Sequence, residues 1–256
     1  EQADWQSMGL SYQILENANP RLIITSITDF GLTGPHSLYK GSGIVSSAMG
    51  GLMYLCGEKS KPPLAEPCEQ TYQIASAYAA FGTLAAIHHR EQHGIAQRVE
   101  ISCQETQSTM QHIAVNYSSN ANVLEREGSR TPIGGGMPYG IYPTKDGFCH
   151  IVVIPTSHWS NFVNWIGNPE ALTDPIWGNR HLRIENRELI EHFTTEFTET
   201  RTKSQLFHDG QQRHITIAPI NTPKEFLNDT NTKARKTFSN VDHPVMGLVP
   251  MVSPPF

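Results

Sequence analysis

The segment from Thr71 to Arg90 constrains the fold more than any other, because it gathers small residues at helical spacing. These small residues are Ala75, Ala79, Gly82 and Ala86. Such a face allows a helix backbone to approach a neighbouring element closely, and Gly94 supplies a stop signal just beyond it. We therefore expect a helix over 71–90 that packs tightly against a sheet.

Two short runs on either side of this helix have the character of strands. Leu22 to Ile27 is a continuous apolar, β-branched run, which is typical of a strand buried on both faces. Arg98 to Ser102 alternates, with Val99 and Ile101 on one side. The order strand, helix, strand favours a parallel sheet, so the predicted fold class is α/β.

A second region of strands and helices follows a change in composition. Residues 125–130 are charged, and Thr131 to Gly140 is rich in Gly and Pro, as in a loop or linker. The best division between domains therefore lies near Gly128. Beyond it, the sequence predicts one strand and three helices, over 147–154, 159–166, 184–200 and 203–209.

Charge and cysteine content limit the possible partners. The formal net charge is −5 and the pI about 6.2, so nucleic acid and anionic membranes are not expected to bind. The longest apolar candidate, 74–87, falls short of the roughly 20 residues that span a bilayer. The four cysteines are widely spread without a CxxC pair, so neither disulfides nor a zinc site is expected, and a cytoplasmic location fits.

The candidate metal site in the sequence is a pair of histidines. His89 and His93 lie four residues apart near the expected helix end, but no carboxylate motif accompanies them. The interpretation we prefer is that His88, His89 and His93 interact with the negative C-terminus of the helix. No metal cofactor is predicted.

A set of short motifs occurs in a fixed order along the chain. Pro20 to Pro35 reads PRLIITSITDFGLTGP, and AMGGL follows at 48–52. Later motifs are AQRVEIS at 96–102, KDGF at 145–148, IAPIN at 217–221 and HPVMG at 243–247. Together they resemble the class III CoA-transferase family, which includes formyl-CoA transferase, carnitine CoA-transferase and 2-methylacyl-CoA racemase.

The resemblance implies a Rossmann-like large domain with a parallel sheet and a smaller α+β domain. Residues 1–127 would then be part of the large domain, 128–216 the small domain with a glycine loop at its start, and 217–256 a return segment to the large domain. It also implies a fragment that lacks both ends of the family's chain. The family's protomers interlock like links of a chain, so we expect an interlocked homodimer or a heterodimer with a paralogue.

The resemblance places the catalytic carboxylate at Glu105, which follows the AQRVEIS strand and opens a helix expected over 103–124. The family's usual residue there is Asp, and the extra methylene moves the carboxylate by roughly 1.5 Å. An alternative interpretation gives Glu105 no catalytic role. The run Ser102-Cys103-Gln104-Glu105 has the pattern of a capping box, in which the Glu105 side chain bonds the Ser102 N–H. The sequence leaves both interpretations open.

Gly134, Gly135 and Gly136 resemble the glycine loop that covers the active site in formyl-CoA transferase. Glycine suits such a loop because its backbone moves easily and its N–H groups can approach a developing oxyanion. The alternative interpretation is a plain interdomain linker.

Coenzyme A is the expected substrate group, and its phosphates require cations. Lys40 and Arg98 are the candidate CoA-binding residues, although a surface Lys or Arg is usually only solvated. Ser42 stands where racemases carry a base histidine, and Gly43 where many family members carry Asp. Because serine cannot act as that base, racemase activity is disfavoured.

The resemblance implies a transferase that moves CoA from an acyl-CoA to a small carboxylic acid, through carboxylate-bound anhydride and thioester intermediates. One alternative is a catalytically silent subunit whose paralogous partner supplies the aspartate. The changes at Gly43 and Glu105 motivate that alternative. A less favoured alternative is an acyl-CoA racemase.

Overall fold

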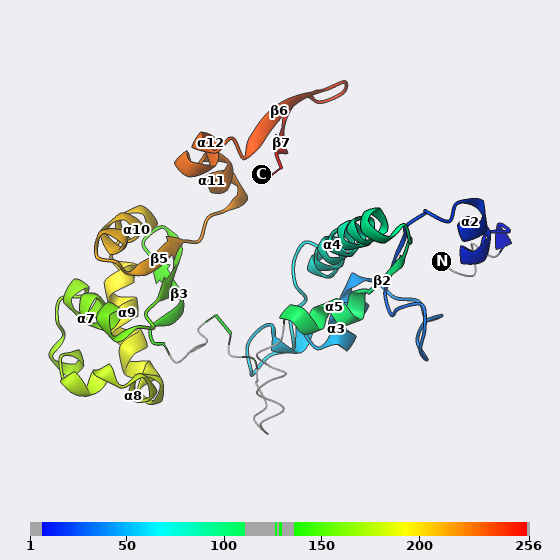
Figure 1. Cartoon of the computed structure of the whole chain (residues 1–256). Coiled ribbons are helices and arrows are strands. Elements are labelled where there is room, and N and C mark those ends of the chain that lie inside the picture. The colour runs from blue at the N-terminus through cyan, green and yellow to red at the C-terminus, as the bar shows by residue number, and fades with distance from the viewer. Residues whose placement is uncertain (1–6, 111–125, 127, 130–135, 255–256) are drawn as a thin grey trace. The chain divides into compact units, whose positions relative to one another are not determined.

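The computed structural model describes residues 7–110, 126, 128–129 and 136–254. Contacts between residues divide the chain into two compact units, Glu1–Ser129 and Arg130–Phe256. Figure 1 shows the elements of both units and labels most of them.

The first unit is built around two parallel strands. Its elements are α2 (Tyr12–Ala18), β1 (Ile24–Thr28), α3 (Gly43–Gly50), α4 (Gln70–His93), β2 (Arg98–Ser102) and α5 (Cys103–Met110), with a 3₁₀ turn over Met53–Leu55. β1 and β2 pair from Ile24 opposite Arg98 to Thr28 opposite Ser102. The predicted parallel pairing of these strands is confirmed.

Helix α4 packs against both strands through its small residues. Its buried residues are Thr71, Ala75, Ala79 and Ala86. A methyl group added at Gly82 would lie 2.8 Å from Val99 Cγ1, so the helix backbone is in close contact with β2. The close approach expected from the sequence is confirmed. Larger apolar residues of the helix are exposed, with Phe81 at 72% and Leu84 at 65%.

Strand β1 is less covered than its composition predicts. Of its five residues only Ile24 is buried, and Ile27 is 47% exposed. The sheet formed by the described residues has two strands, so β1 has a neighbouring strand on one side alone. For these residues the expectation of burial on both faces is wrong.

The second unit contains a three-stranded antiparallel sheet in the order β3–β4–β5. The strands are β3 (Tyr139–Thr144), β4 (Gly147–Val152) and β5 (Thr216–Pro219). The helices are α7 (Thr156–Trp165), α8 (Arg180–Glu185), α9 (Arg187–Glu199) and α10 (Lys203–Gln212), with 3₁₀ turns over Glu170–Leu172 and Pro175–Gly178. The predicted strand and helices are present, except that Asn186 divides the expected 184–200 helix.

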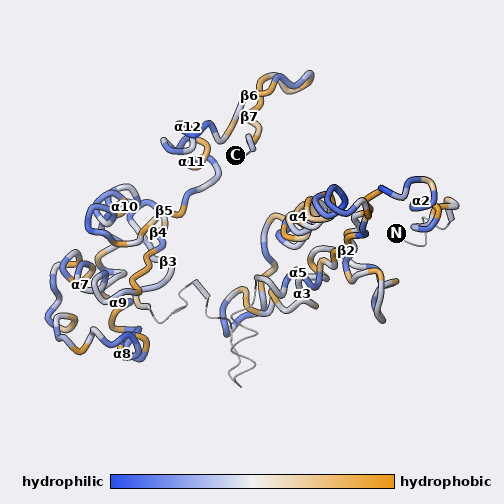
Figure 2. The backbone as a smooth tube through the Cα atoms, in the orientation of Figure 1, coloured by the Kyte–Doolittle hydropathy of each residue, from blue (hydrophilic) through white to orange (hydrophobic). Residues whose placement is uncertain are grey.

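The hydrophobic core of the second unit lies between this sheet and its helices. Figure 2 shows hydrophobic residues along the strands of the unit. The largest apolar residues of the core that are fully buried are Tyr142, Phe162, Met137, Ile151 and Leu172. The core therefore joins residues that are distant in sequence around β3 and β4.

The last described elements follow β5. They are α11 (Pro223–Asn228), α12 (Thr230–Ala234), β6 (Phe238–His243) and β7 (Gly247–Val252). β6 and β7 form an antiparallel hairpin that closes at His243 opposite Gly247. The tip of the hairpin is open to solvent, with Val245 87% exposed.

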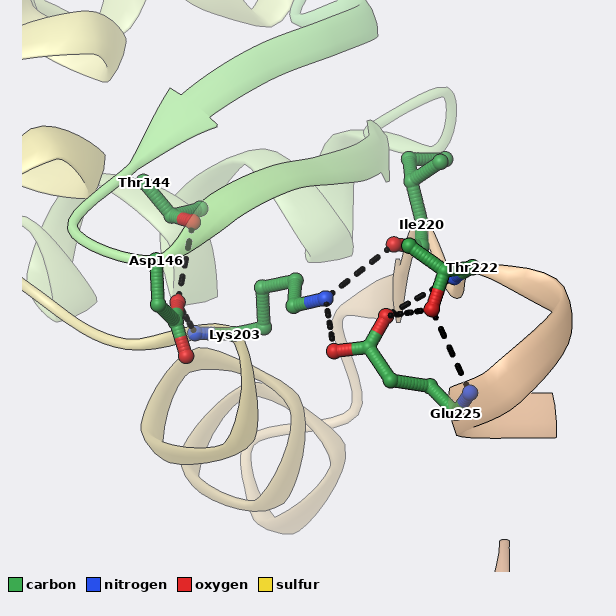
Figure 3. A network of polar contacts seen from close by, with 6 residues as sticks. All are labelled: Thr144, Asp146, Lys203, Ile220, Thr222 and Glu225. Atoms are coloured by element: carbon green, nitrogen blue, oxygen red, sulfur yellow. Dashed lines mark hydrogen bonds and ion pairs between the residues drawn. The ribbon is translucent and has the colours of Figure 1, made fainter. Parts of the chain in front are cut away.

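Lys203 joins three elements through a polar network (Figure 3). Its ammonium group donates to the Glu225 carboxylate at 2.6 Å and to the Ile220 carbonyl at 3.3 Å. Its backbone N–H donates to Asp146 Oδ1 at 2.7 Å. The Lys203 side chain is only 9% exposed, so the network fixes α11 to α10 and to the β3–β4 turn.

The network lowers the pKa of Glu225 from an ordinary 4.5 to about 2. The hydrogen bond from Lys203 is the largest cause, followed by bonds from the N–H and hydroxyl groups of Thr222. The folded state therefore favours the ionised carboxylate more than the unfolded state does. The resulting stabilisation is complete above pH 4.5 and is lost as the pH falls toward 2.

Replacing Lys203 with Met should raise the pKa of Glu225, because it removes the largest cause of the lowering. We expect a value that stays below 4.5, since the Thr222 bonds remain. An NMR titration of the Glu225 carboxyl carbon measures the change, and the exposed neighbour Lys224→Met serves as control. An unchanged titration in Lys203→Met would contradict the network.

Replacing Gly82 with Leu should lower the free energy of unfolding by roughly 1–3 kcal/mol, because the new side chain overpacks against Val99. The matched control is Ala85→Leu on the exposed side of α4, which should stay within about 0.5 kcal/mol of wild type. Urea denaturation measures both. Equal stability of the two variants would show that α4 does not pack through Gly82.

Candidate functional site

Both strands of the first unit end at the same edge of the sheet. β1 ends at Thr28 and is followed by Asp29, whereas β2 ends at Ser102 and leads directly into α5. Because the strands are parallel, Asp29 and the start of α5 lie at one carboxyl edge. At such edges α/β proteins bind ligands and place reacting groups.

Glu105 lies in the first turn of α5 with its side chain exposed. Its backbone N–H donates to Ser102 Oγ at 3.3 Å, so half of the predicted capping box is present. Among the described residues the Glu105 carboxylate has no hydrogen bond or ion pair, and the reciprocal bond to the Ser102 N–H is missing. Ser102 therefore caps the helix while the carboxylate stays available.

Asp29 connects this edge of the sheet to three helices. Its backbone carbonyl accepts a hydrogen bond from the Gln104 N–H of α5 at 3.0 Å. Its Oδ1 accepts from Ser46 Oγ of α3 at 3.1 Å and from the Tyr72 hydroxyl of α4 at 3.3 Å. One residue therefore fixes the starts of α3, α4 and α5 relative to the end of β1.

The Asp29 carboxylate also affects the acidity of two neighbours. Burial raises the pKa of the Tyr72 phenol, and the charge and hydrogen bond of Asp29 raise it further. Burial raises the pKa of the Cys103 thiol to about 11, with the Asp29 charge as second cause. Both groups keep their protons at neutral pH, so neither is a thiolate or phenolate nucleophile.

Gly43 begins α3 at a crowded position. A methyl group there would lie 2.5 Å from Glu69 Oε2 and 3.2 Å from Tyr72 Cε2. A larger residue at position 43 would therefore displace Glu69 or Tyr72. The same glycine lines a pocket of about 230 Å³ at the starts of α3 and α4, together with Ile44, Ala65, Glu66, Cys68, Glu69, Gln70 and Thr71.

The two predicted CoA-binding cations lie at different edges of the sheet. Lys40 directly precedes Gly41, where a methyl group would lie 2.5 Å from Asp29 Cβ at the carboxyl edge. Arg98 begins β2 at the opposite edge and forms an ion pair with Glu16. The structure therefore brings Lys40, but not Arg98, to the edge where α5 begins.

Two of the three predicted loop glycines, Gly134 and Gly135, lie outside the described residues. Gly136 is buried in the second unit, where a methyl group would lie 2.8 Å from the Val153 carbonyl oxygen and 3.1 Å from Ile154 Cα. These are backbone atoms in a packed interior, so they cannot move aside as a flexible side chain can. Close packing alone therefore requires glycine at position 136.

The histidines at the end of α4 form a pair of rings. The ring centres of His89 and His93 are 4.6 Å apart, and His89 Nδ1 lies 3.4 Å from the Ile95 carbonyl oxygen. In the part of the chain that the structure describes, no three His, Cys, Asp or Glu side chains gather where they could hold a metal ion. The helices described there also lack the combined length and hydropathy of a membrane span.

Comparison with known families gives a match over the full sequence. The family model described as CoA-transferase family III matches residues 1–256. The chain belongs to this family. The family resemblance predicted from the motifs is confirmed, and so is the mixed α/β fold class.

Relatives that are CoA-transferases are similar over most of this chain. It is 29% identical over 233 residues to the BbsE subunit of succinyl-CoA:(R)-benzylsuccinate CoA-transferase from Thauera aromatica, covering 86% of this chain and 55% of the relative. It is 29% identical over 248 residues to the succinyl-CoA–D-citramalate CoA-transferase of Chloroflexus aurantiacus, covering 96% and 61%. The chain spans less than two thirds of the length of either relative.

Two solved structures have a fold similar to that of this chain. A CAIB/BAIF family protein from Brucella suis has a TM-score of 0.83 at 25% identity, covering 99% of this chain and 66% of that chain. Rv3272 from M. tuberculosis has a TM-score of 0.84 at 19% identity, covering 99% and 67%. The likeness therefore extends over almost the whole chain.

Sequence reasoning gave no role to Asp29, although it lies within the Pro20–Pro35 motif. A polar residue directly after a strand of a parallel sheet is the signal that could have found it. Its partners Ser46 and Tyr72 are 17 and 43 residues away, so the contacts depend on how the helices pack.

Replacing Asp29 with Ala should lower the free energy of unfolding by roughly 1–3 kcal/mol, because Ser46 and Tyr72 lose a charged acceptor. Asp29→Asn should lose less, since its amide oxygen can accept the same bonds. Urea unfolding followed by fluorescence measures both variants. Equal losses would show that hydrogen bonding is not what Asp29 contributes.

Proposed function

We propose that this chain takes part in the transfer of CoA from an acyl-CoA to a carboxylic acid, with Glu105 as nucleophile. The observation that carries the proposal is the exposed Glu105 carboxylate, which has no partner among the described residues and lies at the carboxyl edge of the sheet. Membership of CoA-transferase family III supports the reaction class. The names of relatives, which describe transfer from succinyl-CoA or formyl-CoA, support it further.

The proposed reaction begins when a Glu105 oxygen attacks the thioester carbonyl carbon. The C–S bond breaks, CoA leaves as thiolate, and a mixed anhydride joins Glu105 to the acyl group. The thiolate then attacks the Glu105 carbonyl carbon, releases the donor acid as a carboxylate, and leaves CoA on Glu105 as a thioester. The acceptor carboxylate reverses these steps, so atoms and charge balance without a redox partner.

The start of α5 suits a nucleophilic carboxylate. Ser102 Oγ and the Asp29 carbonyl accept bonds from the first N–H groups of the helix, so the helix start is fixed without the Glu105 side chain. The helix dipole favours a negative charge at this end. The Glu105 side chain is therefore not needed to hold the helix start, and it stays exposed.

One further role in the proposal belongs to a cation. Lys40, close to the carboxyl edge, is the preferred cation for a CoA phosphate, because Arg98 is already paired with Glu16. Of the three predicted loop glycines, Gly136 is packed in the interior of the second unit and is not part of this proposal.

Glu105→Gln in the intact protein should lower kcat by at least about a hundredfold, because an amide cannot form the anhydride. Incubation with an acyl-CoA donor, followed by hydroxylamine or borohydride trapping and mass spectrometry, should place the modification on Glu105. Glu105→Asp, the family's usual residue, is the control and should remain active. Full transferase activity in Glu105→Gln would assign the chemistry to another residue.

A catalytically silent subunit is the second candidate, and the names of relatives favour it. One relative is subunit BbsE, and others are the alpha and beta subunits of succinyl-CoA–L-malate CoA-transferase, at 27% and 26% identity. In such a pair the partner supplies the nucleophile. In either case we propose an interlocked dimer, and the exposed Phe81 and Leu84 on α4 are apolar surface that a second chain could cover.

Assay of the intact protein alone and with a paralogue separates the two candidates. Activity of the protein alone, lost in Glu105→Gln, is expected if Glu105 is the nucleophile. Activity that requires the paralogue and survives Glu105→Gln would establish the silent subunit. Equilibrium sedimentation tests the assembly, and a stable monomer at micromolar concentration would contradict the dimer.

A further inference from the structure

Tyr72, in the first turn of α4, places a hydroxyl group at the carboxyl edge of the sheet, and the proposed reaction leaves it unused. Its side chain is 36% exposed, and the hydroxyl donates to Asp29 Oδ1 at 3.3 Å. This bond is long, because O–H···O bonds are usually about 2.7–2.8 Å. Ser46 Oγ donates to the same oxygen at 3.1 Å, so Asp29 keeps a partner when the Tyr72 hydroxyl turns to another acceptor.

Asp29 joins the Tyr72 hydroxyl to the start of α5. The N–H of Gln104, the residue before Glu105, donates to the Asp29 carbonyl at 3.0 Å. Burial is the main cause of the raised pKa of the Tyr72 phenol, and the charges of Asp29 and Cys103 add to it. Cys103 is the first residue of α5, so the Tyr72 phenol and the helix turn that carries Glu105 are neighbours within the first unit.

Gly43 leaves the space beside the Tyr72 ring. A methyl group at Gly43 would lie 3.2 Å from Tyr72 Cε2, so a side chain at this position would press on the ring. The family resemblance places Asp at this position in many members. In this chain the change to glycine therefore fits the presence of the Tyr72 ring at the start of α3.

The proposed reaction requires a hydrogen-bond donor at the carbonyl oxygen of the thioester. When Glu105 attacks the carbonyl carbon, this oxygen becomes negatively charged, and a donor already in place lowers the barrier. Burial, followed by the charge of Asp29, raises the pKa of the Tyr72 phenol, so the hydroxyl keeps its proton at neutral pH and remains a donor.

We propose that Tyr72 is a catalytic residue whose hydroxyl turns from Asp29 to the carbonyl oxygen of the bound thioester and to the oxyanion that this oxygen becomes. The inference rests on the proposed function, in which Glu105 is the nucleophile. The proton stays on Tyr72 throughout, so no covalent bond forms or breaks at the phenol. The hydrogen bond strengthens as charge develops on the oxygen, which stabilises the transition state more than the bound substrate.

Tyr72→Phe in the intact protein is the direct test, because it removes only the hydroxyl. We expect kcat to fall at least about a hundredfold, the loss typical of one oxyanion donor, while KM for the acyl-CoA changes less than about twofold. Tyr78→Phe is the matched control, since Tyr78 is a second tyrosine of α4 and is 41% exposed. It should keep the wild-type kcat. An unchanged kcat in Tyr72→Phe would overturn the inference.

A double variant separates contact with the substrate from an effect through Asp29. If the hydroxyl acts only by bonding Asp29, Tyr72→Phe should have no further effect on kcat in an Asp29→Ala background. We expect instead that Tyr72→Phe lowers kcat by about the same factor in both backgrounds. An effect confined to the protein with Asp29 would reduce Tyr72 to a structural partner of Asp29 and overturn the catalytic role.

Infrared spectroscopy gives a readout that does not depend on turnover. An acyl-CoA with an isotope-labelled thioester carbonyl is bound to Glu105→Gln, which cannot form the anhydride. The carbonyl stretching frequency should be lower there than in Glu105→Gln/Tyr72→Phe, because only the former can donate from Tyr72. Equal frequencies, or no binding of the acyl-CoA, would overturn the inference. If wild type binds the acyl-CoA without transferring CoA, the proposed function fails while the carbonyl frequency still decides the role of Tyr72.

Discussion

The hydrogen bonds of Asp29 are the interaction on which the arrangement of the first unit depends. One carboxylate receives donors from α3 and α4, and the carbonyl of the same residue receives the N–H of Gln104 in α5. The end of β1 and the starts of three helices are thus held together at one point. These bonds use backbone groups and the side chains of other residues. The start of α5 is therefore fixed without a hydrogen bond to the Glu105 carboxylate.

Among its described residues, the second unit has two buried cations whose hydrogen-bonding groups are paired to different degrees. Lys203 has a carboxylate and a carbonyl as partners, so its burial strengthens the connection between α10 and α11. Arg183 has one carbonyl and an aromatic ring, which leaves part of its charge uncompensated among the described residues. Paired burial of charge is compatible with a structural role, whereas unpaired burial is retained only against a stability disadvantage.

Local patterns predicted the parallel strands and the tight packing of α4. A β-branched run favours an extended strand, and small residues at helical spacing allow the helix backbone to approach its neighbour closely. They did not predict β3 or β5. Gly140 and Pro143 interrupt the pattern of β3, and β5 has four residues that end in Pro219. For the site, the motif order predicted Glu105 as the catalytic carboxylate, a prediction that the proposed trapping experiment tests, but the sequence left open whether its carboxylate caps the helix. The answer depends on whether the Glu105 carboxylate bonds the Ser102 N–H. Residue spacing allows this bond but does not determine whether it forms.

In the mechanism that we propose, the exposure of Glu105 also affects which product forms. A thioester or anhydride carried on a solvent-facing side chain can be attacked by water as well as by an acid. Attack by water releases free acid and free CoA, so the same intermediate then belongs to a thioesterase. Since the described residues leave Glu105 open to solvent, the proposed mechanism requires a cover over this carboxylate during turnover, and that cover would decide between transfer and hydrolysis.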